Sequence, residues 1–183
     1  PADVLFTPNF APRDEYRAAL AAGVTLTLDN LHCLERWGAD FSGARVFLRL
    51  DPGHGAGHHR HVRTAGTLSK FGIPLDELDR AAQLAREHGV IVTGLHAHLG
   101  SGILDADAWR AAGARLLEAA ERFPELRVLD LGGGLGVPDR PGAPGLDLER
   151  LAAGLADMKR ARGDLELWLE PGRFLVARAG VLL

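Results

Sequence analysis

Hydrophobic positions alternate between two patterns along the chain. Short apolar runs predict buried β-strands at residues 4–7, 24–28, 46–50, 90–95, 127–131 and 165–169. Between these runs, apolar residues three and four positions apart predict amphipathic helices at residues 12–22, 75–87, 105–122 and 148–160. A shorter helix is predicted to follow Asp29 or Asn30 and to end near Trp37. About six strand–helix units in succession are typical of an α/β protein with a parallel sheet.

This pattern fits two architectures. One is an open, doubly wound sheet, and the other is part of an eight-stranded barrel, which normally needs about 250 residues. A chain of 183 residues is expected to form a single domain. In both architectures the chemistry lies at the carboxyl ends of the strands, so the residues at those ends are the candidates for function.

Composition narrows the class of partner. The net charge of −3 supplies no basic stripe for a nucleic acid, and no apolar run reaches the roughly 18 residues that a membrane span requires. The single cysteine, Cys33, excludes an internal disulfide and fits a reducing compartment. We therefore expect a cytoplasmic protein that binds a small molecule rather than nucleic acid or membrane.

Three consecutive glycines, Gly132, Gly133 and Gly134, follow the strand predicted at 127–131. Such a run allows backbone N–H groups to approach an anion, usually a phosphate, although a tight turn without a ligand also explains it. The spacing does not complete the dinucleotide motif G-x-G-x-x-G. Ser101, in a Gly-Ser-Gly loop, and Arg173 would add a hydroxyl and a guanidinium to a phosphate site.

Glu170 ends the apolar run at 165–169, and a partly buried carboxylate there needs a cationic partner. Arg173 is the simpler partner, and the protonated ring nitrogen of a cofactor is the alternative. His96 and His98 are two residues apart and face the same side of a strand. A divalent metal would need further ligands from later strands, so we predict no metal and expect His98 to stack on a planar ligand.

Two further groups of residues have simpler explanations. A loop at 51–66 is rich in glycine and carries four histidines that we expect to be solvated or to lie over the mouth of the site: His54, His58, His59 and His61. Lys70 follows this loop and does not end a strand, so a surface lysine in an ion pair is favoured over a nucleophile.

Four segments together resemble one family. They are residues 69–73 (SKFGI), 94–101 (GLHAHLGS), 129–134 (LDLGGG) and 170–173 (EPGR), and they are similar to the pyridoxal-phosphate decarboxylases with an alanine-racemase-type barrel. Within that family, residues 56–66 and 174–183 favour the diaminopimelate decarboxylases over the ornithine and arginine enzymes. Residues 7–13 and 25–30 are similar to the form fused behind an aspartate kinase. The similarity covers essentially all 183 residues.

The resemblance implies a fold and a site. The fold is a partial TIM (β/α) barrel of the alanine racemase-like type, with about six of the eight strands, and residues 1–183 form one incomplete barrel domain. The cofactor is pyridoxal 5'-phosphate. The resemblance implies that His98 stacks on its ring, that Glu170 pairs with its protonated nitrogen, and that Arg173 contacts phosphate or a substrate carboxylate. The phosphate would be held by Ser101, Gly132, Gly133, Gly134, Gly172 and Arg173.

The implied reaction is decarboxylation of meso-2,6-diaminopimelate to L-lysine. Ornithine, arginine or carboxynorspermidine as the substrate, or a phosphate-binding module without catalysis, are the alternatives. In the family, the lysine that forms a Schiff base lies on the first barrel strand, and a β-domain follows the barrel. We expect both to lie outside this chain, so that it is a fragment, inactive by itself, of an enzyme that acts as a homodimer.

Overall fold

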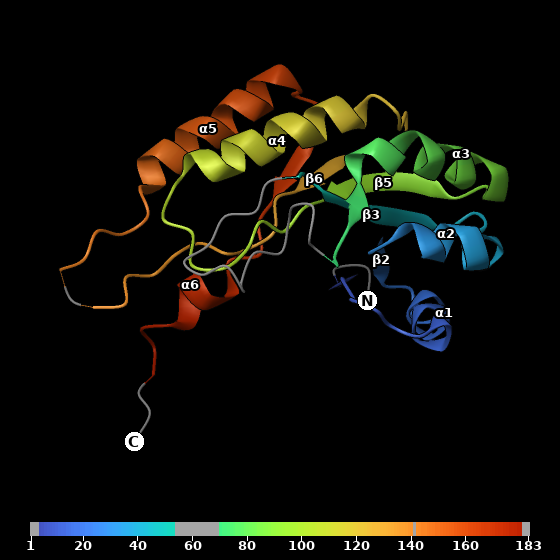
Figure 1. Ribbon diagram of the computed structural model, residues 1–183, viewed down its shortest axis with the longest axis horizontal. Helices are drawn as coiled ribbons and strands as arrows, with labels where there is room; N and C mark the ends of the chain where they lie inside the picture. The colour runs from blue at the N-terminus through green and yellow to red at the C-terminus, as the bar shows by residue number, and fades with distance from the viewer. Residues whose placement is uncertain (1–3, 54–69, 141, 181–183) are drawn as a thin grey trace.

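The computed structural model describes residues 4–53, 70–140 and 142–180, in which one parallel sheet carries helices on its outer side (Figure 1). Its main strands are β1 (Leu5–Phe6), β2 (Thr25–Leu28), β3 (Arg45–Asp51), β5 (Ile91–His96), β6 (Val128–Asp130) and β7 (Glu166–Trp168). The helices are α1 (Arg13–Ala21), α2 (Leu31–Trp37), α3 (Leu78–His88), α4 (Asp107–Ala120), α5 (Leu148–Ala161) and α6 (Gly172–Val176).

The order of the strands decides between the two predicted architectures. The strands pair in the order β1-β2-β3-β5-β6-β7, and every pairing is parallel. A doubly wound sheet reverses its direction of growth at a switch point, whereas a barrel adds each new strand to the same side. In Figure 1 the helices α1 to α5 follow the strands as an arc. The sheet is therefore a curled part of a barrel.

Local sequence signals place the helix ends. The side chain of Asn30 accepts a hydrogen bond from the Cys33 N–H and caps α2, and Asp147 caps α5 by accepting from the Arg150 N–H. Gly89 ends α3 in the left-handed conformation, with φ of 68°. Of the two predicted caps, Asn30 therefore starts α2, which leaves Asp29 for another role.

The strands are buried on the side that faces the helices. Leu28, Leu48, Leu95 and Leu129 have no exposed surface, and Trp109 of α4 is equally buried against them in the same core. Full burial of a leucine side chain stabilises a fold by about 2 kcal/mol. The core therefore lies between the sheet and its helices, and the inner, concave face of the sheet is left for other side chains.

On the inner face, a glycine makes room for an aromatic pair. Gly94 of β5 has no Cβ, and a Cβ built there would lie 2.4 Å from the Phe47 ring of β3. The Phe47 ring instead reaches across to Trp168 of β7, with a centroid distance of 5.4 Å. Trp168 is 37% exposed, because β7 is the last strand of the described sheet. This contact helps to hold the curvature of the inner face.

Three short elements were not predicted. A two-residue strand, β4 (Ile73–Pro74), pairs with the end of β3, a 3-10 helix covers Gly38–Phe41, and α6 begins two residues after Glu170. A second 3-10 helix, Leu75–Glu77, forms the first part of the helix predicted at 75–87. No helix among the described residues has both the length and the apolar character to cross a membrane.

Candidate functional site

The loops after β5, β6 and β7 pack against one another at the carboxyl ends of these strands. The Glu170 N–H donates a 2.8 Å hydrogen bond to the Gly132 carbonyl, which joins the last two loops. The Ile103 N–H donates to the Gly134 carbonyl, also at 2.8 Å, and joins the first two. The triple glycine and the Glu-Pro-Gly-Arg segment therefore lie side by side, as the phosphate-site hypothesis requires.

The three glycines are needed because the loop backbones approach each other closely. A Cβ on Gly133 would lie 2.3 Å from the Glu170 carbonyl oxygen, and one on Gly134 would lie 2.2 Å from that of Gly100. A Cβ on Gly132 would lie 2.6 Å from the Ala97 carbonyl oxygen. Loop packing alone therefore accounts for glycine at these positions, and any anion contact is additional to it.

Backbone donors in this segment are partly used. The Gly132 N–H donates to Asp130 Oδ1 at 2.9 Å, and the Gly133 N–H donates to His98 Nδ1 at 3.3 Å. Within the described residues, the Gly134 N–H has no acceptor, and this residue is partly exposed. Of the three consecutive glycines, Gly134 is thus the one whose N–H is available to an anion.

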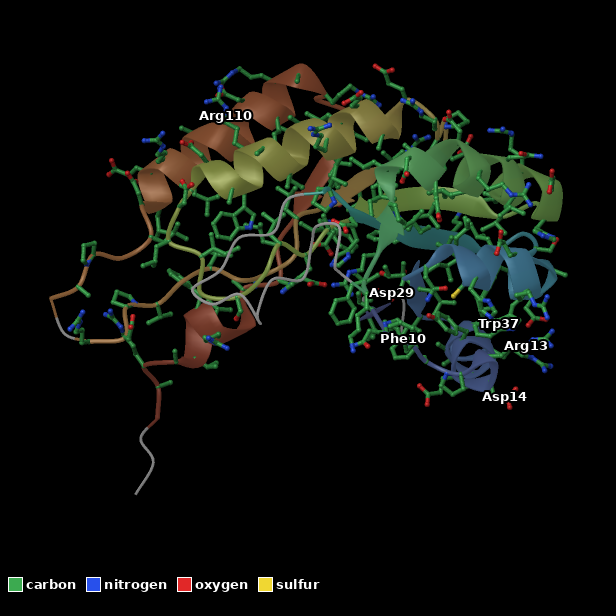
Figure 2. All side chains as sticks on the ribbon, in the orientation of Figure 1. Phe10, Arg13, Asp14, Asp29, Trp37 and Arg110 are labelled. Atoms are coloured by element: carbon green, nitrogen blue, oxygen red, sulfur yellow. The ribbon has the colours of Figure 1, made fainter. Side chains whose placement is uncertain are left out.

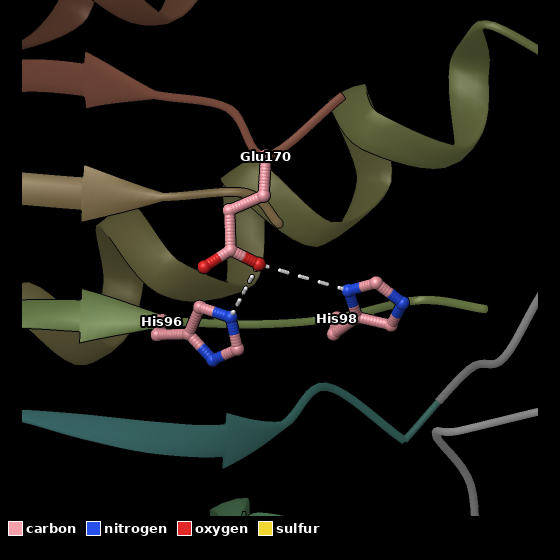
Figure 3. A group of neighbouring side chains, drawn as sticks. All are labelled: His96, His98 and Glu170. Carbon is pink, nitrogen blue, oxygen red and sulfur yellow. Dashed lines mark ion pairs between the residues drawn. The ribbon is translucent and has the colours of Figure 1, made fainter. Parts of the chain in front are cut away.

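Glu170 lies between two histidines (Figure 3). Its Oε2 is 3.5 Å from His96 Nε2 and 4.0 Å from His98 Nδ1. The His96 side chain is 1% exposed, whereas those of His98 and Glu170 are 29% and 37% exposed. The carboxylate therefore faces two imidazole nitrogens on its buried side and remains accessible on the other. Arg173, the simpler predicted partner, makes no ion pair with Glu170.

The surroundings set the charge of these groups. The facing His96 imidazole lowers the pKa of Glu170 below its ordinary value, against the opposing effect of partial burial. Burial, followed by the nearby His96 and Arg49, lowers the pKa of His98. Because Gly133 donates to its Nδ1, a neutral His98 carries its proton on Nε2. The site thus combines an ionised carboxylate with a neutral, planar imidazole.

The sequence assigns no functional role to a row of buried polar residues beside this group. Asp29, Arg49 and Asp130 lie at or just beyond the carboxyl ends of β2, β3 and β6 and are at most 7% exposed. Arg49 Nη1 donates to Asp29 Oδ1 at 2.9 Å, and the Arg49 guanidinium lies 4.7 Å from the centre of the Phe71 ring. Figure 2 labels Asp29 near β2, and Arg110, which belongs to α4, beside α5.

Burial changes the carboxyl groups of this row in the same direction. Burial is the largest effect on both groups and raises their pKa. The nearby Arg49 opposes this rise at Asp29, and His96 opposes it at Asp130. One signal in the sequence could have identified them. Each follows or ends an apolar strand, as Glu170 does, and a charged residue in that position of a parallel sheet points to the mouth of a site.

The other predicted residues fall into two groups. Ser101 lies in the loop after β5, which adjoins the glycines, and Gly172 begins α6 just after Glu170. Arg173 is exposed with no acidic partner among the described residues. The cluster His54, His58, His59 and His61 lies outside the described residues.

Neither of the two lysines contacts this group. The ammonium of Lys70 lies 5.6 Å and 5.0 Å from the ring centres of Phe10 and Phe71, so aromatic rings replace the ion pair expected for it. Lys159 Nζ donates to the carbonyl of Leu165, just before β7 and therefore at the opposite end of that strand.

His96, His98 and Glu170 also have a composition that can hold a metal ion. One ligand atom from each lies within 4.8 Å of the others. Glu170 thus supplies the further carboxylate ligand, from a later strand end, that a metal bound by the two histidines would require. The shortest distance between a histidine nitrogen and a Glu170 oxygen is 3.5 Å. The absence of a metal stays a prediction.

Comparison with known proteins gives a consistent family. The family described as "Pyridoxal-dependent decarboxylase, pyridoxal binding domain" matches residues 1–177. A diaminopimelate decarboxylase of Methanothermobacter thermautotrophicus is 35% identical over 100% of this chain and 46% of its own length. That of Deinococcus radiodurans is 37% identical over 92% of this chain and 42% of its own length.

Solved structures agree with the fold. A crystal structure of a diaminopimelate decarboxylase has a TM-score of 0.82 at 29% identity and covers 96% of this chain and 43% of its own. The Helicobacter pylori enzyme, solved with L-lysine, has a TM-score of 0.84 at 23% identity over 93% of this chain and 45% of its own. The partial (β/α) barrel predicted from the sequence is confirmed. The chain spans less than half the length of these relatives.

Proposed function

Because this chain belongs to the pyridoxal-dependent decarboxylases, which it matches through their pyridoxal-binding domain, we propose that it forms the cofactor site of a diaminopimelate decarboxylase. The cofactor of the family is pyridoxal phosphate. The proposed reaction converts meso-2,6-diaminopimelate to L-lysine in the cytoplasm. The relatives named above support this substrate over ornithine, arginine or carboxynorspermidine.

The observation that carries the proposal is the carboxylate of Glu170 at the convergence of three loops. When bound, pyridoxal phosphate supplies an electron sink for the electron pair that remains as CO₂ leaves. Glu170 would face the protonated ring nitrogen of the cofactor, and an ionised carboxylate there stabilises that proton. The lowered pKa of Glu170 keeps it ionised at neutral pH. The half-buried imidazole of His98 would provide a flat surface for the ring.

The other end of the site fits a phosphate. The Gly134 N–H lacks an acceptor, and Arg173 lacks an acidic partner, among the described residues. Backbone N–H groups and a guanidinium are the donors that bind phosphate best. We assign the phosphate to these two groups together with Ser101, and we allow Arg173 to contact a substrate carboxylate instead. The N–H groups of Gly132, Gly133 and Gly172 already donate to Asp130, His98 and Glu170, so these glycines would only line the phosphate site.

The positions of the lysines bear on turnover. Neither Lys70 nor Lys159 contacts Glu170, His96 or His98, so the amine that the family joins to its cofactor has no counterpart at this cluster. We therefore expect residues 1–183, as a single barrel domain, to bind the cofactor without turning over. In the complete enzyme we propose a homodimer that acts on a small amino acid.

Pyridoxamine 5'-phosphate is a suitable probe of the site because it has no aldehyde to react with surface lysines. Its affinity would be measured by fluorescence titration for the chain and for Glu170→Gln, with inorganic phosphate as the second ligand. We expect Glu170→Gln to weaken the pyridoxamine 5'-phosphate about tenfold and to leave phosphate affinity unchanged. Equal affinity of both forms for the probe would favour the alternative, a phosphate-binding module without catalysis.

A hybrid enzyme tests the substrate. In it, this chain replaces the matching segment of the Deinococcus radiodurans relative, and CO₂ release is measured with each candidate substrate. We expect release from meso-2,6-diaminopimelate, and faster release from ornithine or arginine would contradict the proposed substrate.

A further inference from the structure

His96 is the most buried member of the group around Glu170 and has no role in the proposed contacts with the cofactor. It ends β5, is 1% exposed, and neither of its ring nitrogens has a hydrogen bond of ordinary geometry to another residue. A buried imidazole without such a bond is unfavourable unless it serves a neighbouring charge. Its nearest carboxylate is that of Glu170, whose Oε2 lies 3.5 Å from Nε2.

Charged groups from every neighbouring strand surround this imidazole. Strand β5, which carries His96, lies between β3 and β6. In register with His96 are Arg49 on β3 and Asp130 on β6. Asp29 reaches the same row from β2 through Arg49, and His98 follows on the same chain. The row thus contains three acidic side chains and one guanidinium, of which Asp29 and Arg49 pair with each other, and His96 lies between this pair and Glu170.

The two histidines contact the same oxygen of Glu170. His96 Nε2 and His98 Nδ1 both face Oε2, at 3.5 Å and 4.0 Å. His98 Nδ1 already accepts from the Gly133 N–H, so a neutral His98 has no proton there to donate to Glu170. His96 is thus the donor available to Oε2, and the other oxygen, Oε1, is left for a ligand.

We propose that His96 is a positioning residue that donates its Nε2 proton to Glu170 Oε2 and thereby directs Oε1 to the ring nitrogen of the cofactor. This inference rests on the proposed function, because it assigns the ligand of Oε1 to that ring nitrogen. His96 contacts neither substrate nor cofactor in this role. It acts by fixing one rotamer of a carboxylate that is 37% exposed and would otherwise turn toward water.

The experiment follows the proton of the ligand instead of turnover. The chain is titrated with pyridoxamine 5'-phosphate labelled with ¹⁵N in the ring, and the dissociation constant and the ¹⁵N shift of the bound ring nitrogen are recorded. His96→Leu removes the donor, and His96→Gln keeps an N–H near the position of Nε2. His32→Leu, on α2 beside Trp37, is the matched histidine substitution away from the site.

We expect His96→Leu to raise the dissociation constant about tenfold and to shift the ring nitrogen toward its unprotonated value. His96→Gln should remain within about threefold of the unsubstituted chain, and His32→Leu should match it. A packing role alone predicts that Gln disturbs the site as much as Leu does and that the bound nitrogen stays protonated. That result, or unchanged binding by His96→Leu, would overturn the proposal.

A second measurement needs no substitution at His96. In the ligand-free chain with ¹⁵N-labelled histidine, Glu170→Gln should move the Nε2 resonance of His96, because its acceptor loses its charge. An unmoved resonance would refute the contact even where His96→Leu fails to fold. If the unsubstituted chain does not bind pyridoxamine 5'-phosphate, the proposed function fails. If the chain binds it, and Glu170→Gln weakens the binding while His96→Leu does not, the proposed function stands and the inference about His96 fails.

Discussion

Replacing Gly134 by alanine tests whether loop packing fixes the site. This glycine has φ of +85°, and an added Cβ would lie 2.2 Å from the Gly100 carbonyl oxygen. Two separate costs are therefore expected, one from the left-handed backbone and one from the collision. Other glycines separate them, because Gly142 has φ of +81° with nothing within 4 Å, and Gly133 lacks a positive φ but would collide with the Glu170 carbonyl at 2.3 Å.

The magnitudes follow from these contacts. A left-handed alanine costs about 1–2 kcal/mol, and overpacking against a backbone that cannot rotate away costs about 1–3 kcal/mol. We therefore expect losses of roughly 2–5 kcal/mol for Gly134→Ala, about 1–2 for Gly142→Ala and about 1–3 for Gly133→Ala. Gly172→Ala has neither cost, since nothing lies within 4 Å of it, and should leave stability unchanged.

Urea unfolding followed by circular dichroism gives the four free energies, with the slope of the transition checked for each variant. The affinity for pyridoxamine 5'-phosphate is measured beside them. It should fall for Gly133→Ala and Gly134→Ala, whose loops carry the site, and stay constant for Gly142→Ala. Equal losses of stability for Gly134→Ala and Gly142→Ala would refute close packing of the loops after β5 and β6.

Three further predictions concern charge and packing. Asp29→Asn leaves Arg49 buried without its carboxylate and should lower the free energy of unfolding, measured by urea unfolding, by about 3–5 kcal/mol. A loss under about 1 kcal/mol would contradict a tight buried ion pair. The pKa of Glu170 is lowered from 4.5, so its contribution to stability is present at neutral pH and is lost as the pH falls through the lowered value. Glu170→Gln should therefore reduce the fall of the thermal midpoint at acid pH. An unchanged dependence of the midpoint on pH would argue against the lowered pKa. Gly94→Ala should cost about 1–3 kcal/mol by displacing Phe47, and much less in a Phe47→Ala background, so additive losses in calorimetry would exclude the contact.

The sequence predicted the main strands because each is a short, dense apolar run followed by an amphipathic helix. It predicted the neighbourhood of Glu170, His98 and the glycines because carboxyl ends of parallel strands share one edge. It did not predict β4 or α6, since a two-residue strand and a five-residue helix form through contacts with other segments and carry no periodic signal.

Partners across the sheet were likewise beyond the sequence. Asp29 was considered as a helix cap, yet Asn30 caps α2 and Asp29 binds Arg49 from the next strand. Arg173 is one predicted partner of Glu170, whereas the structure places His96 against it; the pairing with a cofactor stays a prediction. These pairings depend on strand register, and no local pattern encodes which residue a neighbouring strand brings opposite.

The unbroken order of the strands also gives the rim an electrical polarity. Asp29 and Arg49 form an ion pair at the β2–β3 side, whereas the ionised Glu170 places negative charge just after β7. Adjacent strands lie about 4.8 Å apart, so the potential changes over roughly 19 Å from one side to the other. A ligand with a positive and a negative end is thereby oriented across the sheet, and the order of the strands determines which way round it binds.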